Sequence, residues 1–365
     1  MNVQTRSLVH LVGSFPCRTA AEVFTHCGRE LGGHLKRIPD GEAHGWLNFS
    51  TSSLAQAQGI ERASDEDVYA PAYATPAELR DYHERAQTRQ RLTPRLRVRP
   101  GVSAQDLEFA PLGYDRIALE SYQVFKQAQT QGRLAREVRF QVGFPTPFAT
   151  LASVFGARDV RLALPRFEEA LFREVEAIMR AIPHAELAIQ WEVAVEVVTV
   201  LERMAPALAA TFSAEDIARA LARACQQVSA DVEVGVHLCY GNPGGKHIIE
   251  PRDTSVMVDF ANQFFAIVRR PIQWLHMPVP IARDDDAYFS PLQRLARPAE
   301  TELFLGLVHP QDGLEGARGR IRAARRFTPT FGIGTECGLR FFASETLPQL
   351  LALHRAAAAA NAALS

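Results

Sequence analysis

The sequence lacks several features that mark whole classes of protein. Its 40 basic and 41 acidic side chains nearly cancel to a formal net charge of -1, so no field favours nucleic acid or an anionic membrane surface. No apolar run approaches the roughly 20 residues of a membrane-spanning helix, and the first residues lack the basic and then apolar pattern of a secretory signal. We therefore expect a cytoplasmic protein that acts on a small molecule. Neither nucleic acid nor a membrane is expected as a partner, and the oligomeric state is left open.

Cysteine is also sparse. The five cysteines are an odd number scattered through a large chain, at positions Cys17, Cys27, Cys225, Cys239 and Cys337. This pattern argues against a disulfide framework and favours reduced thiols. Thiolates therefore remain available as metal ligands.

What the sequence does contain is a recurring alternation of two kinds of segment. Short apolar runs are followed, in most cases, by segments with helical periodicity. The apolar runs predict eight strands, over residues 8–13, 34–38, 138–143, 186–191, 232–238, 272–276, 302–308 and 328–333. Eight strands that alternate with helices predict a parallel sheet closed into a (β/α)8 TIM barrel, an α/β fold in which residues 1–365 form a single domain.

One connection breaks this alternation. About a hundred residues separate the second and third predicted strands, and they include a stretch rich in proline and alanine (69–76) and two predicted helices (77–92 and 119–131). Loops of that length without structure are rare inside a compact domain. Residues 43–137 are therefore predicted to form an inserted helical subdomain over the mouth of the barrel.

Side chains that can take part in catalysis or metal binding fall at one end of the predicted strands. In barrels of this kind, catalytic groups come from the carboxyl ends of the strands and from the loops that follow. These positions are occupied by Gly13, Ser14, Asp40, Glu42, Glu192, His237, Cys239, His276, His309 and Cys337. We therefore expect these residues to meet at one face of the barrel.

His237 and Cys239 carry the most specific signal. Two residues apart on a strand, they project to the same side, and the distant Cys337 adds a second thiolate, so together they could bind one zinc ion. The spacing alone is not decisive, because cysteine and strand histidine are often buried core residues. Their shared position at one end of the predicted barrel favours the metal site.

Seven short segments, in order along almost the whole chain, form a further pattern. They are Val12-Gly13-Ser14-Phe15-Pro16, Gly41-Glu42, Gly143-Phe144-Pro145-Thr146, Ile189-Gln190-Trp191-Glu192, His237-Leu238-Cys239-Tyr240, His309-Pro310 and Cys337-Gly338-Leu339. The ordered set resembles the catalytic domain of cobalamin-independent methionine synthase (MetE), within the superfamily that also includes uroporphyrinogen decarboxylase.

The resemblance implies a zinc-dependent methyltransferase. In that family zinc holds a thiol substrate as thiolate, which attacks a methyl group on a folate. By similarity His237, Cys239 and Cys337 are three of the zinc ligands, and His309 lies near the thiol. Residues Gly13, Ser14 and Glu42 correspond to those that hold the amino-acid part of the substrate.

The chain departs from the family at three places. His276 stands where the family has a glutamate ligand; it could replace this ligand, which gives two histidines and two cysteines, or it could donate a hydrogen bond to a loop carbonyl. Trp191 stands where an aspartate anchors the substrate amine, which predicts a bulkier and less polar substrate beside Trp191. The tryptophan that stacks on the folate has no counterpart in residues 149–155. These departures favour alkylation of a thiol over methionine synthesis, and folate, although the family uses it, is not the favoured cofactor.

The carboxylates at the strand ends leave alternatives open. Asp40, Glu42 and Glu192 could orient the substrate or transfer a proton, or they could form ion pairs with Arg37 or Arg283 that brace the mouth. At the level of function, a zinc-dependent lyase that acts on a carbon–sulfur bond, a metal-free decarboxylase and a binding protein without activity are the other candidates. Metal analysis separates the zinc enzymes from the rest.

Overall fold

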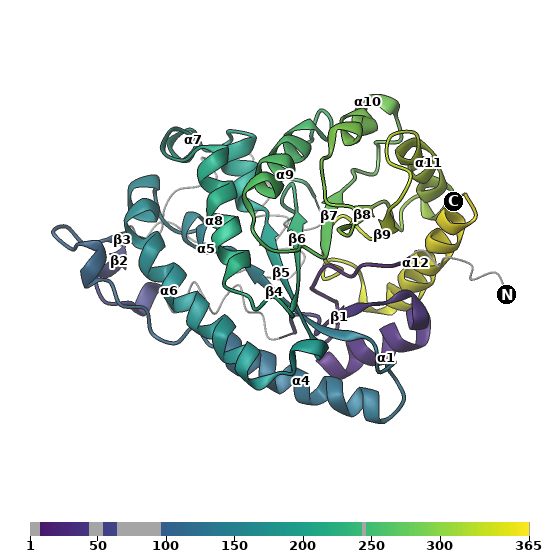
Figure 1. Ribbon diagram of the computed structural model, residues 1–365, viewed down its shortest axis with the longest axis horizontal. Helices are drawn as coiled ribbons and strands as arrows, with labels where there is room; N and C mark the ends of the chain where they lie inside the picture. The colour runs from purple at the N-terminus through teal and green to yellow at the C-terminus, as the bar shows by residue number, and fades with distance from the viewer. Residues whose placement is uncertain (1–7, 44–53, 64–95, 243–245, 365) are drawn as a thin grey trace.

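A parallel sheet forms the centre of the computed structural model, which describes residues 8–43, 54–63, 96–242 and 246–364 (Figure 1). Its seven strands lie in the order β1-β4-β5-β6-β7-β8-β9, and each pairs in parallel with the next. The strands are β1 (Arg37–Pro39), β4 (Arg139–Pro145), β5 (Leu187–Val193), β6 (Glu233–Leu238), β7 (Trp274–Pro278), β8 (Glu302–Gly306) and β9 (Gly332–Ile333).

The segment that begins at residue 8 lies between the two edge strands of this sheet. Val9 forms a parallel bridge with Ile333 of β9, and its amide donates to the carbonyl of His34, just before β1. Further along, Ser14 forms a parallel bridge with Gly41, just after β1. The curled sheet and this segment are compatible with the predicted (β/α)8 barrel.

The predicted strands match the observed ones except at the two ends of the chain. The first predicted strand, 8–13, forms isolated bridges instead of a regular strand. The last, 328–333, is regular only at Gly332 and Ile333. Pro329 has no amide hydrogen to donate to a ladder, which is one reason for the late start. Gly332 then permits a close approach, since a Cβ there would lie 2.4 Å from the ring of Phe304.

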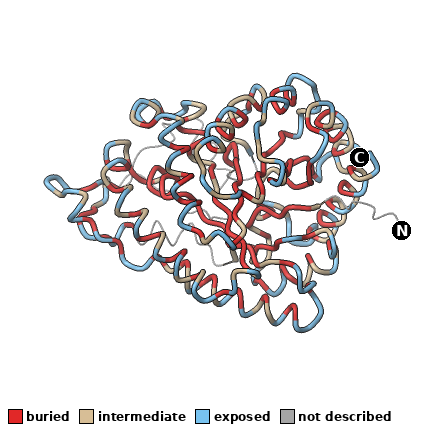
Figure 2. Tube along the Cα trace, in the orientation of Figure 1, coloured by how far each residue is buried: buried red, intermediate tan, exposed pale blue. Residues whose placement is uncertain are grey.

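Helices cover the outside of the sheet. The described residues contain α1 (Ala20–Leu31), α4 (Tyr114–Thr130), α5 (Pro147–Ala152), α6 (Ala157–Ala181), α7 (Pro206–Thr211), α8 (Ala214–Gln226), α9 (Ser255–Ile267), α10 (Asp286–Phe289), α11 (Gly313–Arg325) and α12 (Leu347–Ala362). Buried residues gather in the strands and on the helix faces turned toward them (Figure 2). None of the helices in the described part of the chain is long and apolar enough to cross a membrane.

Helix ends follow local sequence signals. At the start of α8, the Ser213 hydroxyl accepts from the Asp216 amide, and the Asp216 carboxylate accepts from the Ser213 amide. This reciprocal pair satisfies amides that have no partner within the helix. The C-terminal α12 packs against α1 and α11, so the last helix lies beside the first (Figure 1).

Residues 43–137 are described only in part. The predicted helix 77–92 lies outside the described residues, and the predicted helix 119–131 corresponds to α4, which packs against α1 and α6. Two short strands that the sequence does not predict, β2 (Ile60–Arg62) and β3 (Leu96–Val98), form an antiparallel pair. The amide of Val98 donates to Asp159 in the first turn of α6, so β3 lies on the side where β4 ends.

Charged side chains connect the strands at their amino ends. Arg37, the first residue of β1, is buried and contacts the carboxylates of Glu233 on β6 and Glu302 on β8, at 2.5 and 3.0 Å. Its guanidinium carbon lies 4.2 Å from the centre of the Trp274 ring. Because β1, β6 and β8 are not neighbours in the sheet, Arg37 links strands across its interior.

A buried carboxyl group connects the segments that follow β4 and β5. Thr146 caps the start of α5 by accepting from the amide of Ala149, and its hydroxyl donates to the carboxyl group of Glu196. The other oxygen of that carboxyl group has no hydrogen-bond partner in the described part of the chain. Burial raises the pKa of Glu196 to about 7, partly offset by the bond from Thr146.

Glu196 is therefore expected to make folding depend on pH. Between its ordinary pKa of 4.5 and about 7, the unfolded chain releases a proton that the folded chain retains, so stability falls as pH rises through this window. The substitution Glu196→Gln removes the ionisation, and at pH 8 it should stabilise the protein by on the order of 3 kcal/mol. Denaturant unfolding of both proteins at pH 5 and pH 8 measures the difference. Identical pH slopes for the two proteins would contradict the assignment.

Candidate metal centre

Three of the predicted ligands meet in the structure. The ligand atoms of His237, Cys239 and Cys337 all lie within 4.8 Å of one another. His237 is on β6, Cys239 directly follows that strand, and Cys337 lies in the loop after β9. His237 and Cys239 are buried and Cys337 is partly buried. One imidazole and two thiols at this spacing suit a single zinc ion.

Backbone pairing places these side chains. The amide of Cys239 donates to the carbonyl of Val193, which continues the pairing of β6 with β5 one residue beyond the strand. The alternation along this extended segment turns His237 and Cys239 to the same side. The loop with Cys337 is attached to the N-terminal segment, because the amide of Leu339 donates to the carbonyl of Ser14 at 2.6 Å.

The protonation of the thiols depends on whether a cation is bound. The neighbouring Cys239 thiol and burial raise the pKa of Cys337 well above its usual range, so without a cation it stays protonated. A bound metal ion reverses this preference, because thiols that coordinate a metal are deprotonated. Burial also lowers the pKa of His237 well below its usual range, which keeps this imidazole in the neutral form that binds metals.

His276 is not part of the group of three. It lies in register with His237 on the neighbouring strand β7, and the Nδ1 atoms of the two rings are 2.8 Å apart. Burial lowers the pKa of His276 to about 3. The structure therefore places the predicted fourth ligand beside His237, in contact with its ring.

Two carboxylates lie against Gly13. A Cβ on this residue would be 2.2 Å from an oxygen of Glu42 and 3.4 Å from an oxygen of Glu192, so glycine leaves the space that they occupy. Glu192 is in register with His237 on the neighbouring strand. Burial and the nearby Cys337 raise the pKa of Glu192 to about 8. A cation in this space would favour the ionised carboxylates.

A tight turn presents Glu42. Gly41 and Glu42 both have positive φ, at 86° and 52°, which is an uncommon conformation for glutamate. One carboxylate oxygen of Asp40 accepts from the amide of Glu42, and the other accepts from the Ser121 hydroxyl. Arg340 donates to the carbonyl of Glu42. Asp40, predicted as a catalytic residue, thus uses one oxygen within the turn that carries Glu42 and the other to bind Ser121 of α4.

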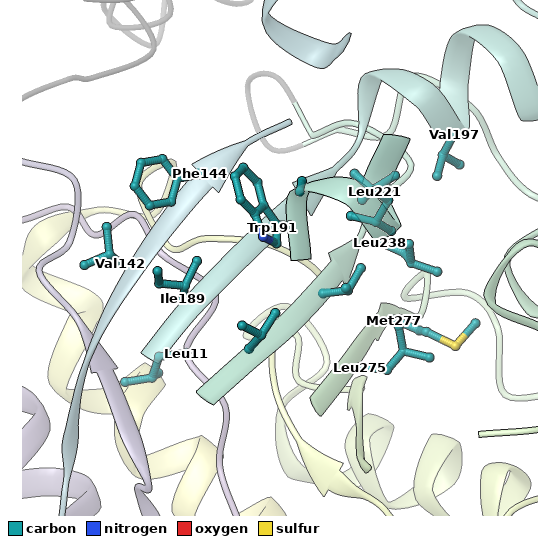
Figure 3. Close-up of a cluster of buried hydrophobic side chains, with 14 of the residues drawn as sticks. Leu11, Val142, Phe144, Ile189, Trp191, Val197, Leu221, Leu238, Leu275 and Met277 are labelled. Atoms are coloured by element: carbon teal, nitrogen blue, oxygen red, sulfur yellow. The ribbon is translucent and has the colours of Figure 1, made fainter. Parts of the chain in front are cut away.

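Trp191, predicted as a substrate-binding residue, packs among aromatic side chains outside this group of polar residues. Its ring is fully buried, and the ring centroid lies 5.5 Å from that of Phe144 (Figure 3). The ring centroid of Phe172 on α6 is 6.5 Å away. Side chains alternate along a strand, so Trp191 faces the helices while its neighbour Glu192 faces the interior.

The arginines predicted as possible partners for the mouth carboxylates do not pair with them. Arg37 binds Glu233 and Glu302 at the amino ends of the strands, and Arg283 pairs with Asp285. The prediction of ion pairs that brace the mouth through either arginine is therefore not supported.

His309 is held at both ring nitrogens. Its Nε2 donates to the carbonyl of Val279 at 2.9 Å, and its Nδ1 lies 3.7 Å from a carboxylate oxygen of Glu336. The other oxygen of Glu336 lies 2.6 Å from Nε2 of His247. Sequence reasoning missed Glu336 as a site residue, although its place directly before Cys337 was a usable signal.

Comparisons with known proteins support the fold. No family model and no curated protein matches the chain. A structure from Listeria monocytogenes, assigned as a vitamin-B12-independent methionine synthase, is 13% identical, with a TM-score of 0.53 over 93% of this chain and 86% of that one. A B12-independent methionine synthase from Shewanella sp. W3-18-1, in complex with selenomethionine, is 14% identical, with a TM-score of 0.57 over 96% of both chains. The chain therefore has a methionine-synthase-like fold, and the predicted resemblance is confirmed at that level.

Proposed function

We propose that the chain is a zinc-dependent transferase of the methionine synthase type, which activates a thiol for transfer of a methyl or other alkyl group. The observation that carries this proposal is the convergence of His237, Cys239 and Cys337 at the carboxyl end of the sheet. The donor set fits zinc because thiolates and imidazole are its preferred ligands, and the buried Nε2 of His237 has no hydrogen-bond partner in the described residues.

The same proposal includes a closed barrel and an insertion at its mouth. Residues 1–365 form one barrel domain in which the segment from residue 8 completes the ring, and residues 43–137 are an insertion at its mouth. The bridges of Val9 and Ser14 to the two edge strands support the closed ring. The position of β3 beside the start of α6 supports the insertion.

Each residue of the site has a proposed task. When bound, zinc lowers the pKa of a thiol and holds it as a thiolate at neutral pH. His237, Cys239 and Cys337 hold the ion, and catalytic zinc sites with three protein ligands leave a fourth position for the substrate. Glu42 and Glu192 provide negative charge for a cationic group of the substrate, such as an ammonium. Gly13 leaves the space for both carboxylates.

Further residues position these groups or border them. Ser14 holds the loop of Cys337 in place, and a Cβ on Gly338 would lie 2.1 Å from the Ser14 hydroxyl oxygen. Asp40 acts through Glu42, because one of its oxygens accepts from the Glu42 amide and the other is bound by Ser121 of α4. Burial lowers the pKa of His309 to about 4, so at neutral pH this ring is uncharged and borders the site as a neutral polar group.

The methyl donor is not proposed to be a folate. A pterin needs an aromatic face to stack on. The one aromatic side chain in residues 149–155 is that of Phe155, and it is buried. An anchor for a substrate amine, in contrast, is present, because Glu192 faces the interior where Trp191 does not. An amino thiol is therefore a suitable acceptor, while 5-methyltetrahydrofolate should be a poor donor. Robust formation of methionine from homocysteine and this folate would contradict that part of the proposal.

Thiol binding tests the proposed function directly. The zinc-loaded protein should bind homocysteine with release of about one proton, because a thiol with a pKa of about 8.5 is bound as thiolate at pH 7. Calorimetry in two buffers of different ionisation enthalpy measures the proton count. The bound thiol should also react with methyl iodide, a small probe donor, faster than free homocysteine at the same pH.

The outcomes separate the candidates. Stoichiometric zinc without proton release on thiol addition would contradict the thiol-activating role. A protein purified without zinc and unable to bind it would favour the metal-free decarboxylase. Cleavage of a thioether without any added methyl donor would favour the lyase, which needs the same three ligands.

A further inference from the structure

We propose that His276 is a positioning residue outside the metal's ligand set, which orients His237 through an imidazole–imidazole hydrogen bond. This inference rests on the proposed zinc site. It replaces the sequence prediction of two histidine and two cysteine ligands by a set of one histidine and two cysteines. The contact that carries it is the 2.8 Å distance between the Nδ1 atoms of the two rings.

The register of the sheet makes this contact. His237 and His276 are paired positions on the parallel strands β6 and β7, so both side chains leave the sheet on the same side and at the same level. The three residues whose ligand atoms all lie within 4.8 Å of one another include His237 but not His276. His276 is therefore beside the ligand rather than around the ion.

Proton counting on the two rings gives the direction of the bond. A neutral imidazole has one N–H donor and one acceptor nitrogen. For His237 to bind metal through Nε2, its proton must be on Nδ1, and that proton is donated to Nδ1 of His276. The proton of His276 is then on its own Nε2, which lies beside Gly334 and has no hydrogen-bond partner in the described part of the chain. Each ring keeps one proton and no charge is created.

The surroundings fix the ring of His276. It is fully buried, and the ring of His10 lies on it with a centroid distance of 5.4 Å. A Cβ on Gly334 would be 3.0 Å from Nε2 of His276, so glycine at this position leaves room for the ring. A ring held in this way presents one fixed acceptor to His237.

This arrangement has a chemical consequence for the site. Histidine ligands usually donate their second N–H to a carboxylate, a carbonyl or a water, and such partners change metal affinity by about 10- to 100-fold. A neutral imidazole is a weaker acceptor than a carboxylate, so it orients His237 without adding negative charge. Two thiolates then balance the charge of Zn²⁺, and the fourth position is left for the sulfur of the substrate.

X-ray absorption spectroscopy of the zinc-loaded wild-type protein tests the ligand set. We expect a fit with two sulfur atoms and one imidazole. A fit with two imidazoles would overturn this inference and leave the proposed zinc enzyme intact. A wild-type protein that holds no zinc would overturn the proposed function and this inference with it, so the two failures are distinguishable.

Variants of His276 test the positioning role. His276→Leu removes the acceptor and should weaken zinc binding by about 10- to 100-fold while the fit still shows two sulfur atoms and one imidazole. His276→Gln offers an amide oxygen to His237 and should recover part of the lost affinity, and it also serves if the leucine variant does not fold. The matched control is His354→Gln, a buried histidine on α12 that should leave zinc affinity unchanged. Wild-type zinc affinity in His276→Leu would refute the role.

Discussion

Replacing Cys239 by serine is expected to abolish tight zinc binding while leaving the fold intact. The substitution removes a thiolate that directly binds the ion, so affinity should fall by more than the factor of about 100 that a lost outer partner can cost. The barrel should still fold, since its core is formed by the apolar strands and helices rather than by the metal. Competition with a chromophoric chelator measures the dissociation constant, and circular dichroism monitors the fold.

Cys17→Ser is the matched control for this experiment. Cys17 is a partly buried thiol that does not belong to the group of three ligands. Its substitution should leave zinc stoichiometry at one per chain. Undiminished zinc in Cys239→Ser, or an equal loss in both variants, would remove the proposed centre.

Arg37→Ala should produce the largest loss of stability among the substitutions that spare the metal site. The side chain is 4% exposed and binds Glu233 and Glu302, so its removal leaves two partly buried carboxylates short of a cation. Breaking one side of a buried ion pair costs about 3 to 5 kcal/mol. Here Lys36 and Arg139 also contact these carboxylates, which favours the lower end of that range. Urea unfolding at pH 7 measures the change.

An exposed arginine provides the control. Arg180 pairs with Glu176 one turn away on α6, and both side chains are more than 60% exposed. Exposed pairs of this kind contribute about 0.5 kcal/mol or less, so Arg180→Ala should be nearly neutral. If the two alanine variants lose similar amounts of stability, the network at the amino ends of the strands is not the stabilising element described here.

The strands of the sheet were predictable because their residues are buried on both faces. The apolar run of β8 stands out in the sequence, and the number and spacing of such runs predict the barrel. The ends of the ring were harder to predict, because residues 8–13 and 328–333 pair only through isolated bridges or two residues. The β2–β3 pair was missed because each strand is only three residues long.

The site was predictable where spacing along one strand decides the geometry. The alternation that turns His237 and Cys239 to one side is local, whereas their meeting with Cys337 depended on the barrel. The partners of His276 and His309 could not be predicted, since they depend on the register between strands and on loop conformation. The orientation of Trp191 is a local feature, because the alternation of Gln190 and Glu192 with apolar neighbours already indicates which side chains face inward.

The hydrogen bond from Leu339 to Ser14 has a consequence for the order in which the protein folds during synthesis. It joins the first described segment to a loop close to the end of the chain, and the same loop brings Cys337 to the ligands on β6. During synthesis, the nascent chain therefore exposes His237 and Cys239 long before their third partner leaves the ribosome. Pairing of the first described segment with this loop and assembly of the proposed metal site therefore both wait until synthesis has passed Leu339.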